Sequence, residues 1–293
     1  MSVSVMIRPL AILLPLAALN VPAQRLNVYS PFTRIGPDGS VVKADKGSAD
    51  PRSILSPGVP RNGTTPLRIV VELDKPEPYW LDLGQNPENA VKLRLYRENF
   101  VETPDGYLPD TLTAVNIPYR GFETDFRLPG QKAVTFWLEM GVANDAPVER
   151  IKVEPELYVD SVKDWIIYPM EVRVQSPQVP GKPVSAGQKS HLPPLTAPAD
   201  AAVFAVLCDD PRSRTAPESR PPEGQTTGRE LIHSYVQQDL SLLKKPADLE
   251  PLFRKITGVE RKGWCSSPKT LPTGPEWYLR LRDAIYKQAG ASD

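Results

Sequence analysis

The sequence predicts a mainly β protein: an immunoglobulin-like antiparallel β-sandwich, followed by a proline-rich linker and a small α-helical C-terminal region. Three observations predict this order. Prolines number 34 among 293 residues, against a typical share of about 5%, and proline interrupts helix interiors and central sheet ladders. Residues 66–175 hold short alternating segments separated by turn signals. Within that stretch, prolines interrupt every window that could hold a helical period.

The predicted strands are short and mostly half-buried. In the clearest one, Val91, Leu93 and Leu95 fall on one face, while charged residues and a tyrosine fall on the other. Further strands are expected at 67–73, 79–83, 100–102, 111–117, 134–140, 151–159 and 165–174. Before the sandwich, residues 24–65 form an extended lead-in, with short strands expected at 27–33 and 40–44.

The first 23 residues have the layout of a bacterial-type signal peptide. An apolar run extends from Leu10 to Leu19, and small residues lie three and one before a cut after Ala23. The run is shorter than the roughly 20 residues that span a bilayer. We therefore expect a mature protein without a membrane span, exported to the periplasm or the extracellular space. A buried N-terminal helix is the alternative, and Pro15 inside the run disfavours it.

Residues 176–199 are expected to form an extended, semi-rigid linker, with a PxxP-type ligand as the alternative. The C-terminal region, 200–293, carries capping boxes at 227–230 and 273–276, and each predicts the start of an amphipathic helix. A short helix is expected over 248–257, with a glycine as its stop.

The two cysteines, Cys208 and Cys265, are expected to form a disulfide. An even cysteine count in an exported chain favours a bridge, which would hold a helical region with a thin core. Closing the loop between them contributes about 4 kcal/mol by chain entropy. Two free thiols are the alternative. A metal site is disfavoured because only two histidines, His191 and His233, accompany the cysteines, and neither lies at ligand spacing.

No catalytic, cofactor-binding or metal-binding residues are expected. The sequence has no Gly-x-Ser-x-Gly elbow, no His-Glu-x-x-His zinc motif and no Gly-x-x-x-x-Gly-Lys phosphate loop. Asp209 and Asp210 precede Pro211 and fit a turn better than a carboxylate pair. Lysine plus arginine and aspartate plus glutamate both number 35, so no basic surface is expected to attract nucleic acid.

Four aromatic residues on predicted strands are candidates for binding: Tyr79, Trp80, Trp137 and Trp165. Neighbouring pairs such as Tyr79/Trp80 and Phe136/Trp137 place one ring on each face of a sheet. One ring of each pair is expected in the core, and the other on an exposed face, where it could bind a sugar or a protein surface. Core packing or edge protection is the alternative role for all of them.

Several short motifs occur in an order that resembles the N-terminal β-sandwich modules of some secreted multidomain glycoside hydrolases. They are Pro60-Arg61-Asn62, Phe100-Val101, Tyr107-Leu108-Pro109-Asp110, Leu128-Pro129-Gly130-Gln131, Phe136-Trp137-Leu138 and Asp145-Ala146-Pro147. The resemblance covers about 60–175 and implies a sandwich fold. The sequence departs from the pattern at 148–150, where Val-Glu-Arg replaces Gly-Thr-Tyr. Only about 118 residues follow, against the ~250 of a (β/α)₈ barrel, so no residue is expected to inherit a catalytic role.

These features predict a non-catalytic exported module, interacting or structural, that binds a protein or cell-envelope partner. The alternative is a carbohydrate-binding accessory module acting beside a separate glycoside hydrolase. An enzyme of unfamiliar type, with carboxylates that sequence cannot pair, is a third reading.

Overall fold

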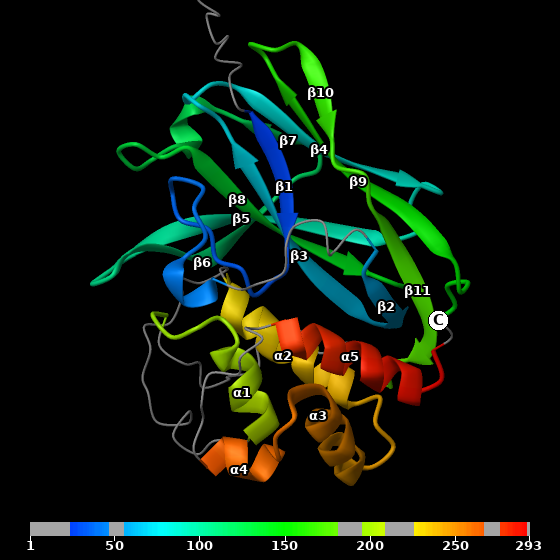
Figure 1. Cartoon of the computed structure of the whole chain (residues 1–293). Coiled ribbons are helices and arrows are strands. Elements are labelled where there is room, and N and C mark those ends of the chain that lie inside the picture. Colours follow the sequence, from blue (N-terminus) through cyan, green and yellow to red (C-terminus); the bar gives the residue numbers. More distant parts are fainter. Residues whose placement is uncertain (1–23, 47–55, 181–194, 209–225, 267–275, 292–293) are drawn as a thin grey trace, which may run out of the picture.

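The computed structural model describes residues 24–46, 56–180, 195–208, 226–266 and 276–291. It shows two facing β-sheets with a layer of helices against one of them (Figure 1). The expected signal peptide, His191, the Asp209/Asp210 turn and the second capping box lie outside the described residues.

The first sheet has six strands, all paired antiparallel. In spatial order they are β1 (Arg25–Tyr29), β3 (Thr64–Glu72), β8 (Ala133–Gly141), β5 (Lys92–Thr103), β6 (Gly106–Val115) and β12 (Thr226–Thr227). β12 comes from the C-terminal region, which therefore contributes a strand to the edge of the sandwich.

The second sheet is mixed. Its order is β2 (Gly58–Arg61), β11 (Glu171–Gln178), β9 (Arg150–Val159), β4 (Tyr79–Asn86) and β7 (Tyr119–Gly121), and β10 (Asp164–Ile167) pairs with β9 beside β11. β2 runs parallel to β11, whereas the other pairs are antiparallel. The expected antiparallel sandwich is therefore confirmed, and β2 with β11 is a parallel pair within it.

The core lies between the two sheets and follows the alternation of the strands. On β4, residues 79, 81 and 83 are buried while residues 80, 82 and 84 are only half-buried. β9 repeats this pattern along 151–159. Among the largest side chains of this core are Ile69, Tyr79, Leu81, Leu95 and Phe136.

The lead-in and the strand boundaries differ in detail from the expectation. Its first strand, β1, ends at Tyr29, and residues 43–45 form a 3-10 helix instead of a strand. The segments expected at 91–97 and 100–102 are one strand, β5, and the segment expected at 165–174 is divided into β10 and β11. The differences at β5, β10 and β11 depend on pairing with strands distant in the sequence, which local sequence does not encode.

Five helices form the described C-terminal region: α1 (Ala201–Cys208), α2 (Gly228–Leu240), α3 (Leu249–Thr257), α4 (Arg261–Ser266) and α5 (Glu276–Gln288). The capping box before α2 is confirmed, since Thr227 and Glu230 each accept a hydrogen bond from the other's backbone N–H. Gly258 ends α3 in the left-handed conformation, as expected. α1 and α4 are not among the helices that the sequence predicts.

The helical layer packs on the outer face of the first sheet. Phe32, Leu112 and Trp137 from the sandwich share one apolar cluster with residues of all five helices, including Tyr235 of α2 and Trp277 of α5. The C-terminal region is thus joined to the sandwich by a common core. Among the described residues, no helix is long and apolar enough to cross a membrane.

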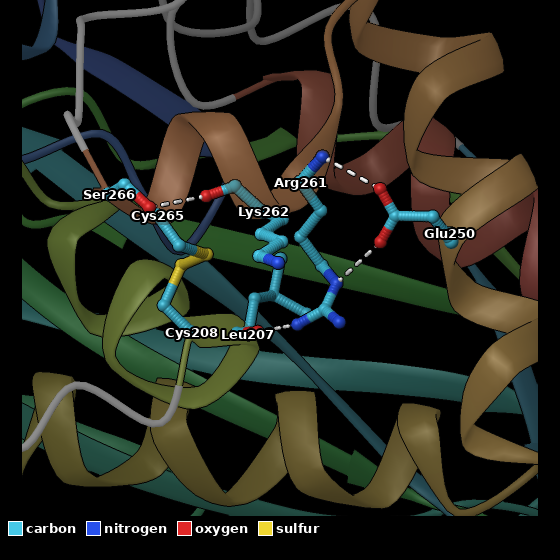
Figure 2. Close-up of a disulfide and its surroundings, with 7 residues drawn as sticks. All are labelled: Leu207, Cys208, Glu250, Arg261, Lys262, Cys265 and Ser266. Atoms are coloured by element: carbon cyan, nitrogen blue, oxygen red, sulfur yellow. Dashed lines mark hydrogen bonds and ion pairs between the residues drawn. A yellow bond between two sulfur atoms is a disulfide. The ribbon is translucent and has the colours of Figure 1, made fainter.

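The expected disulfide between Cys208 and Cys265 is confirmed, with the two Cα atoms 5.4 Å apart. It joins the end of α1 to α4 (Figure 2). Arg261 strengthens the same junction, because its guanidinium donates to the Leu207 carbonyl at 2.6 Å and contacts the Glu250 carboxylate at 3.1 Å. The bridge and the ion pair therefore connect α1, α3 and α4 at the end of the layer.

Candidate binding surface

Two of the four candidate aromatics lie at the surface and two are fully buried. Trp165 is 46% exposed on β10, and Trp80 is half-buried on the outer face of β4. Tyr79 lies in the core between the sheets, where its hydroxyl donates to Asp125 at 3.0 Å and burial raises its pKa well above the usual value. Tyr79 thus fills a structural role in this fold.

Trp137 corrects the expectation that one ring of the Phe136/Trp137 pair faces solvent, because both rings are fully buried. Trp137 does point away from the space between the sheets, but the helical layer covers it. The ring of Tyr235 stacks on it with centroids 6.5 Å apart, and Gly228 lies so close that an added Cβ would be 3.1 Å from the indole. Alternation along β8 correctly predicts that Trp137 lies on the outer face of the sheet, but it does not predict that helices cover this face.

An aromatic row crosses the outer face of the second sheet. Strand pairing places Arg120, Trp80, Tyr158 and Trp165 directly opposite one another on β7, β4, β9 and β10. The Arg120 guanidinium lies 5.1 Å from the Trp80 ring centroid and 5.3 Å from that of Phe122, and the rings of Tyr158 and Trp165 are 5.4 Å apart. These five residues are called the aromatic row below. Three strand spacings make it about 14 Å long.

Apolar and acidic side chains border the aromatic row. Ile167, two residues after Trp165, is 50% exposed. On this same side of the row, Ile167 is opposite Glu156 of β9, and Glu156 is opposite Asp82 of β4, with Glu154 next along β9. Partial burial, together with the charges of Asp82 and Glu154, raises the pKa of Glu156. Glu156 lies over Gly84, where an added Cβ would be 2.6 Å from its carboxylate oxygen.

The chemistry of the aromatic row is that of a contact surface. The Arg120 side chain makes no hydrogen bond or ion pair with any described residue, so its N–H groups can donate to an acceptor on a partner. Trp, Tyr and Arg are the residue types that contribute most binding energy at protein interfaces. In the described part of the chain, no cluster of three or more His, Cys, Asp or Glu side chains could hold a metal ion.

Sequence reasoning found Trp80 and Trp165 but missed Tyr158, Arg120 and Phe122. Tyr158 carried a usable signal, since it falls on the polar face of the alternating segment 151–159. Arg120 and Phe122 carried none, because β7 is only three residues long and its place beside β4 depends on the fold.

The fold belongs to the immunoglobulin-like β-sandwich class, and comparisons with known proteins add no family. No family model and no curated protein matches the chain. A family 123 glycoside hydrolase from Clostridium perfringens, described by its glycolipid glycan hydrolysis, matches at 13% identity and TM-score 0.36, covering 54% of this chain and 28% of that one. This chain thus spans under a third of the hydrolase chain.

Two further solved structures carry PapD-like or chaperone names. The human CEP192 PapD-like domain 7 matches at 10% identity and TM-score 0.25, over 61% of this chain and 97% of that one. The YadV chaperone matches at 9% identity and TM-score 0.23, over 45% and 54%. The resemblance to glycoside hydrolase modules and to these domains is one of fold only.

Proposed function

We propose that this protein is an exported, non-catalytic binding module that holds a protein partner of the cell envelope through its aromatic row. The observation that carries the proposal is the row itself. Trp80, Tyr158, Trp165 and Arg120 are brought together from four strands on a face that no described element covers. Truncating such a residue at an interface centre typically costs more than about 1 kcal/mol of binding energy.

The geometry favours a protein over a carbohydrate as the occupant. A sugar ring needs a free, flat aromatic face to stack on. One face of Trp80 carries the Arg120 guanidinium, and the rings of Tyr158 and Trp165 are tilted by 49° to each other. The exposed Ile167 beside them adds an apolar contact suited to a protein side chain. The carbohydrate-binding accessory module remains the second candidate, supported by the two tryptophans on one sheet face.

Export is part of the proposal and has two supports. The apolar run of residues 10–19 followed by small residues is typical of a signal peptide. The Cys208–Cys265 disulfide fits an oxidising compartment, where such bridges persist.

Site-specific photo-crosslinking in intact cells tests the proposal. A photoreactive residue at Ile167 should yield an adduct with one defined envelope protein. The matched control is Val259, an exposed apolar residue in the helical layer (39% against 50%), which should not yield that adduct. The purified partner should then bind Trp165→Ala at least about tenfold more weakly than the unaltered protein.

Two outcomes would contradict the proposal. Identical adducts from Ile167 and Val259 would show that the contact is not specific to the aromatic row. Saturable glycan binding that is lost in Trp165→Ala, with no protein adduct, would support the carbohydrate-binding alternative.

A further inference from the structure

A groove lies at the junction of the sandwich and α2, on the side of the molecule that carries the helical layer. Its volume is about 1060 Å³, at the upper end of the roughly 300–1,000 Å³ of small-molecule sites. β5, the end of β8, the loop between β4 and β5, and α2 form its walls. The groove has one apolar wall and one polar wall.

The apolar wall lies at one end of the sandwich, where strands β4 and β5 of the two sheets come together. It is formed by Leu83, Ala90, Val91, Leu93, Ile117 and Val142. Ala90, Leu93 and Ile117 are only partly buried, although they pack against the core. Their remaining apolar surface faces the groove, and covering it would be favourable by the hydrophobic effect.

The polar wall is centred on a nearly buried carboxylate whose oxygens are already hydrogen-bonded. The Tyr96 hydroxyl donates to one oxygen of Glu139 at 2.9 Å, and the Tyr235 hydroxyl donates to the other. Burial, followed by the charge of Glu139, raises the pKa of Tyr96 to about 12 and that of Tyr235 well above its usual value. Both tyrosines therefore stay protonated donors near neutral pH. Gln238 is likewise engaged, through both atoms of its amide, by the backbone of Thr64.

The rim of the groove carries the charge that remains available. Lys92 and Arg94 extend from the outer face of β5. The Arg94 side chain is 57% exposed and reaches within 3.8 Å of Glu139, so most of its donors remain open to solvent. The Lys92 side chain makes no hydrogen bond or ion pair with the described residues. Glu139 is the only acidic residue in the described lining, so the lining carries a net positive charge.

We infer that this groove binds a single-chain amphiphile with an anionic head group. The acyl or alkyl chain lies along the apolar wall between Leu93 and Ile117, and Arg94 and Lys92 receive the head group at the rim. A carboxylate and a phosphate would serve equally as the head group, because both accept hydrogen bonds from a guanidinium such as that of Arg94. No residue of the aromatic row lines the groove, so this inference is independent of the aromatic row.

Binding of three twelve-carbon probes to the mature chain tests the inference. Dodecanoate and dodecyl phosphate carry an anionic head, and dodecanol is the neutral control. Calorimetric titration below the critical micelle concentration should show saturable binding of at least one anion, about tenfold tighter than dodecanol. The preference between carboxylate and phosphate identifies the head group.

Three variants locate the site. Arg94→Gln should weaken binding of the anion about tenfold while leaving dodecanol unchanged. The matched control Arg254→Gln removes an arginine of similar exposure (69%) from α3 and should change neither. Ala90→Glu places a charge in the apolar wall and should abolish binding of all three probes, with an unchanged far-ultraviolet spectrum showing that the fold is intact.

The inference is overturned if neither anion binds saturably below its critical micelle concentration. It is also overturned if dodecanol binds as tightly as the anions and Arg94→Gln has no effect. Trp165→Ala should bind the probes normally, so failure of the proposed protein-binding function and failure of this groove would be seen separately.

Discussion

The two outer faces of the sandwich carry similar side chains, but helices cover one face and leave the other open. The first sheet presents Trp137 and Glu139, and the second presents Trp80, Trp165 and Glu156. Helices cover the first face, so Trp137 has no exposed surface. No described element covers the second face, so its tryptophans remain at least partly open. Outward alternation in a strand therefore does not distinguish a core tryptophan from a surface one.

The charged side chains on the two faces also differ in burial. On the covered face, the buried Arg68 and Glu98 form a paired contact with two N–O distances of 2.7 Å, and Arg229 meets Asp110 at the edge. Burial requires this pairing, because an unpaired buried charge is very costly. On the open face, the ion pair between Lys152 and Glu154 is partly exposed, and such a pair contributes about 0–1 kcal/mol.

The largest expected effect on the free energy of unfolding comes from comparing two single variants, Trp137→Ala on the covered face and Trp165→Ala on the open face. Trp137→Ala should reduce the free energy of unfolding by about 3–5 kcal/mol, because it leaves a cavity between β8 and α2. Trp165→Ala should reduce it by less than about 1 kcal/mol, because the side chain is already half in water. Urea unfolding followed by circular dichroism measures both. Equal losses of unfolding free energy in the two variants would contradict the distinction between the covered and open faces.

Removing the disulfide tests how firmly the covering layer is joined to the first sheet. A Cys208→Ser, Cys265→Ser double variant should lose about 2–4 kcal/mol of stability by the loop-closure argument. Because the helices share an apolar cluster with Trp137, we expect one unfolding transition at lower denaturant concentration.

The control for this experiment is Ser266→Ala, a surface change beside the bridge that should have little effect. Two separate transitions, with the sandwich unaffected, would show instead that the layer and the sheet are independent units.

A smaller, pH-dependent effect is expected inside the layer. Asp239 of α2 accepts hydrogen bonds from Tyr278 and Tyr286 of α5, at 2.5 and 2.7 Å. Burial raises its pKa to about 6, with Arg282 and the tyrosines opposing the rise. The folded pKa exceeds the unfolded value of about 3.9, so the folded state binds the proton more tightly. Stability should therefore fall as the pH rises from about 4 to 6 and stay level above that range.

Asp239→Asn should remove this slope, which amounts to at most about 3 kcal/mol. Urea unfolding at several values between pH 4 and pH 7 measures it. Asp105→Asn, in the exposed turn between β5 and β6, should keep the slope of the unaltered protein. An unchanged slope in Asp239→Asn would assign the pH dependence to other groups.

Local sequence signals identified much of the scaffold. They also identified Trp80 and Trp165, two of the four aromatic side chains in the aromatic row. The Thr227 to Glu230 capping box, the glycine stop of α3 and the alternation of 91–97 all depend on residues within a few positions of each other. Trp80 and Trp165 were recognised as candidates because strand periodicity places them on faces. Their meeting with Tyr158 and Arg120 depends on the register of three strand pairs, which no local pattern encodes.

The sequence by itself determined the sandwich class, the helical C-terminal region and the pairing of Cys208 with Cys265. Hydrophobic period, capping chemistry and cysteine count are short-range or compositional properties, so they can be read along the chain. Only the tertiary structure decided that the C-terminal helices cover Trp137 and leave Trp165 open. Which face an added layer buries depends on complementary packing between segments about a hundred residues apart, and that complementarity exists only after folding.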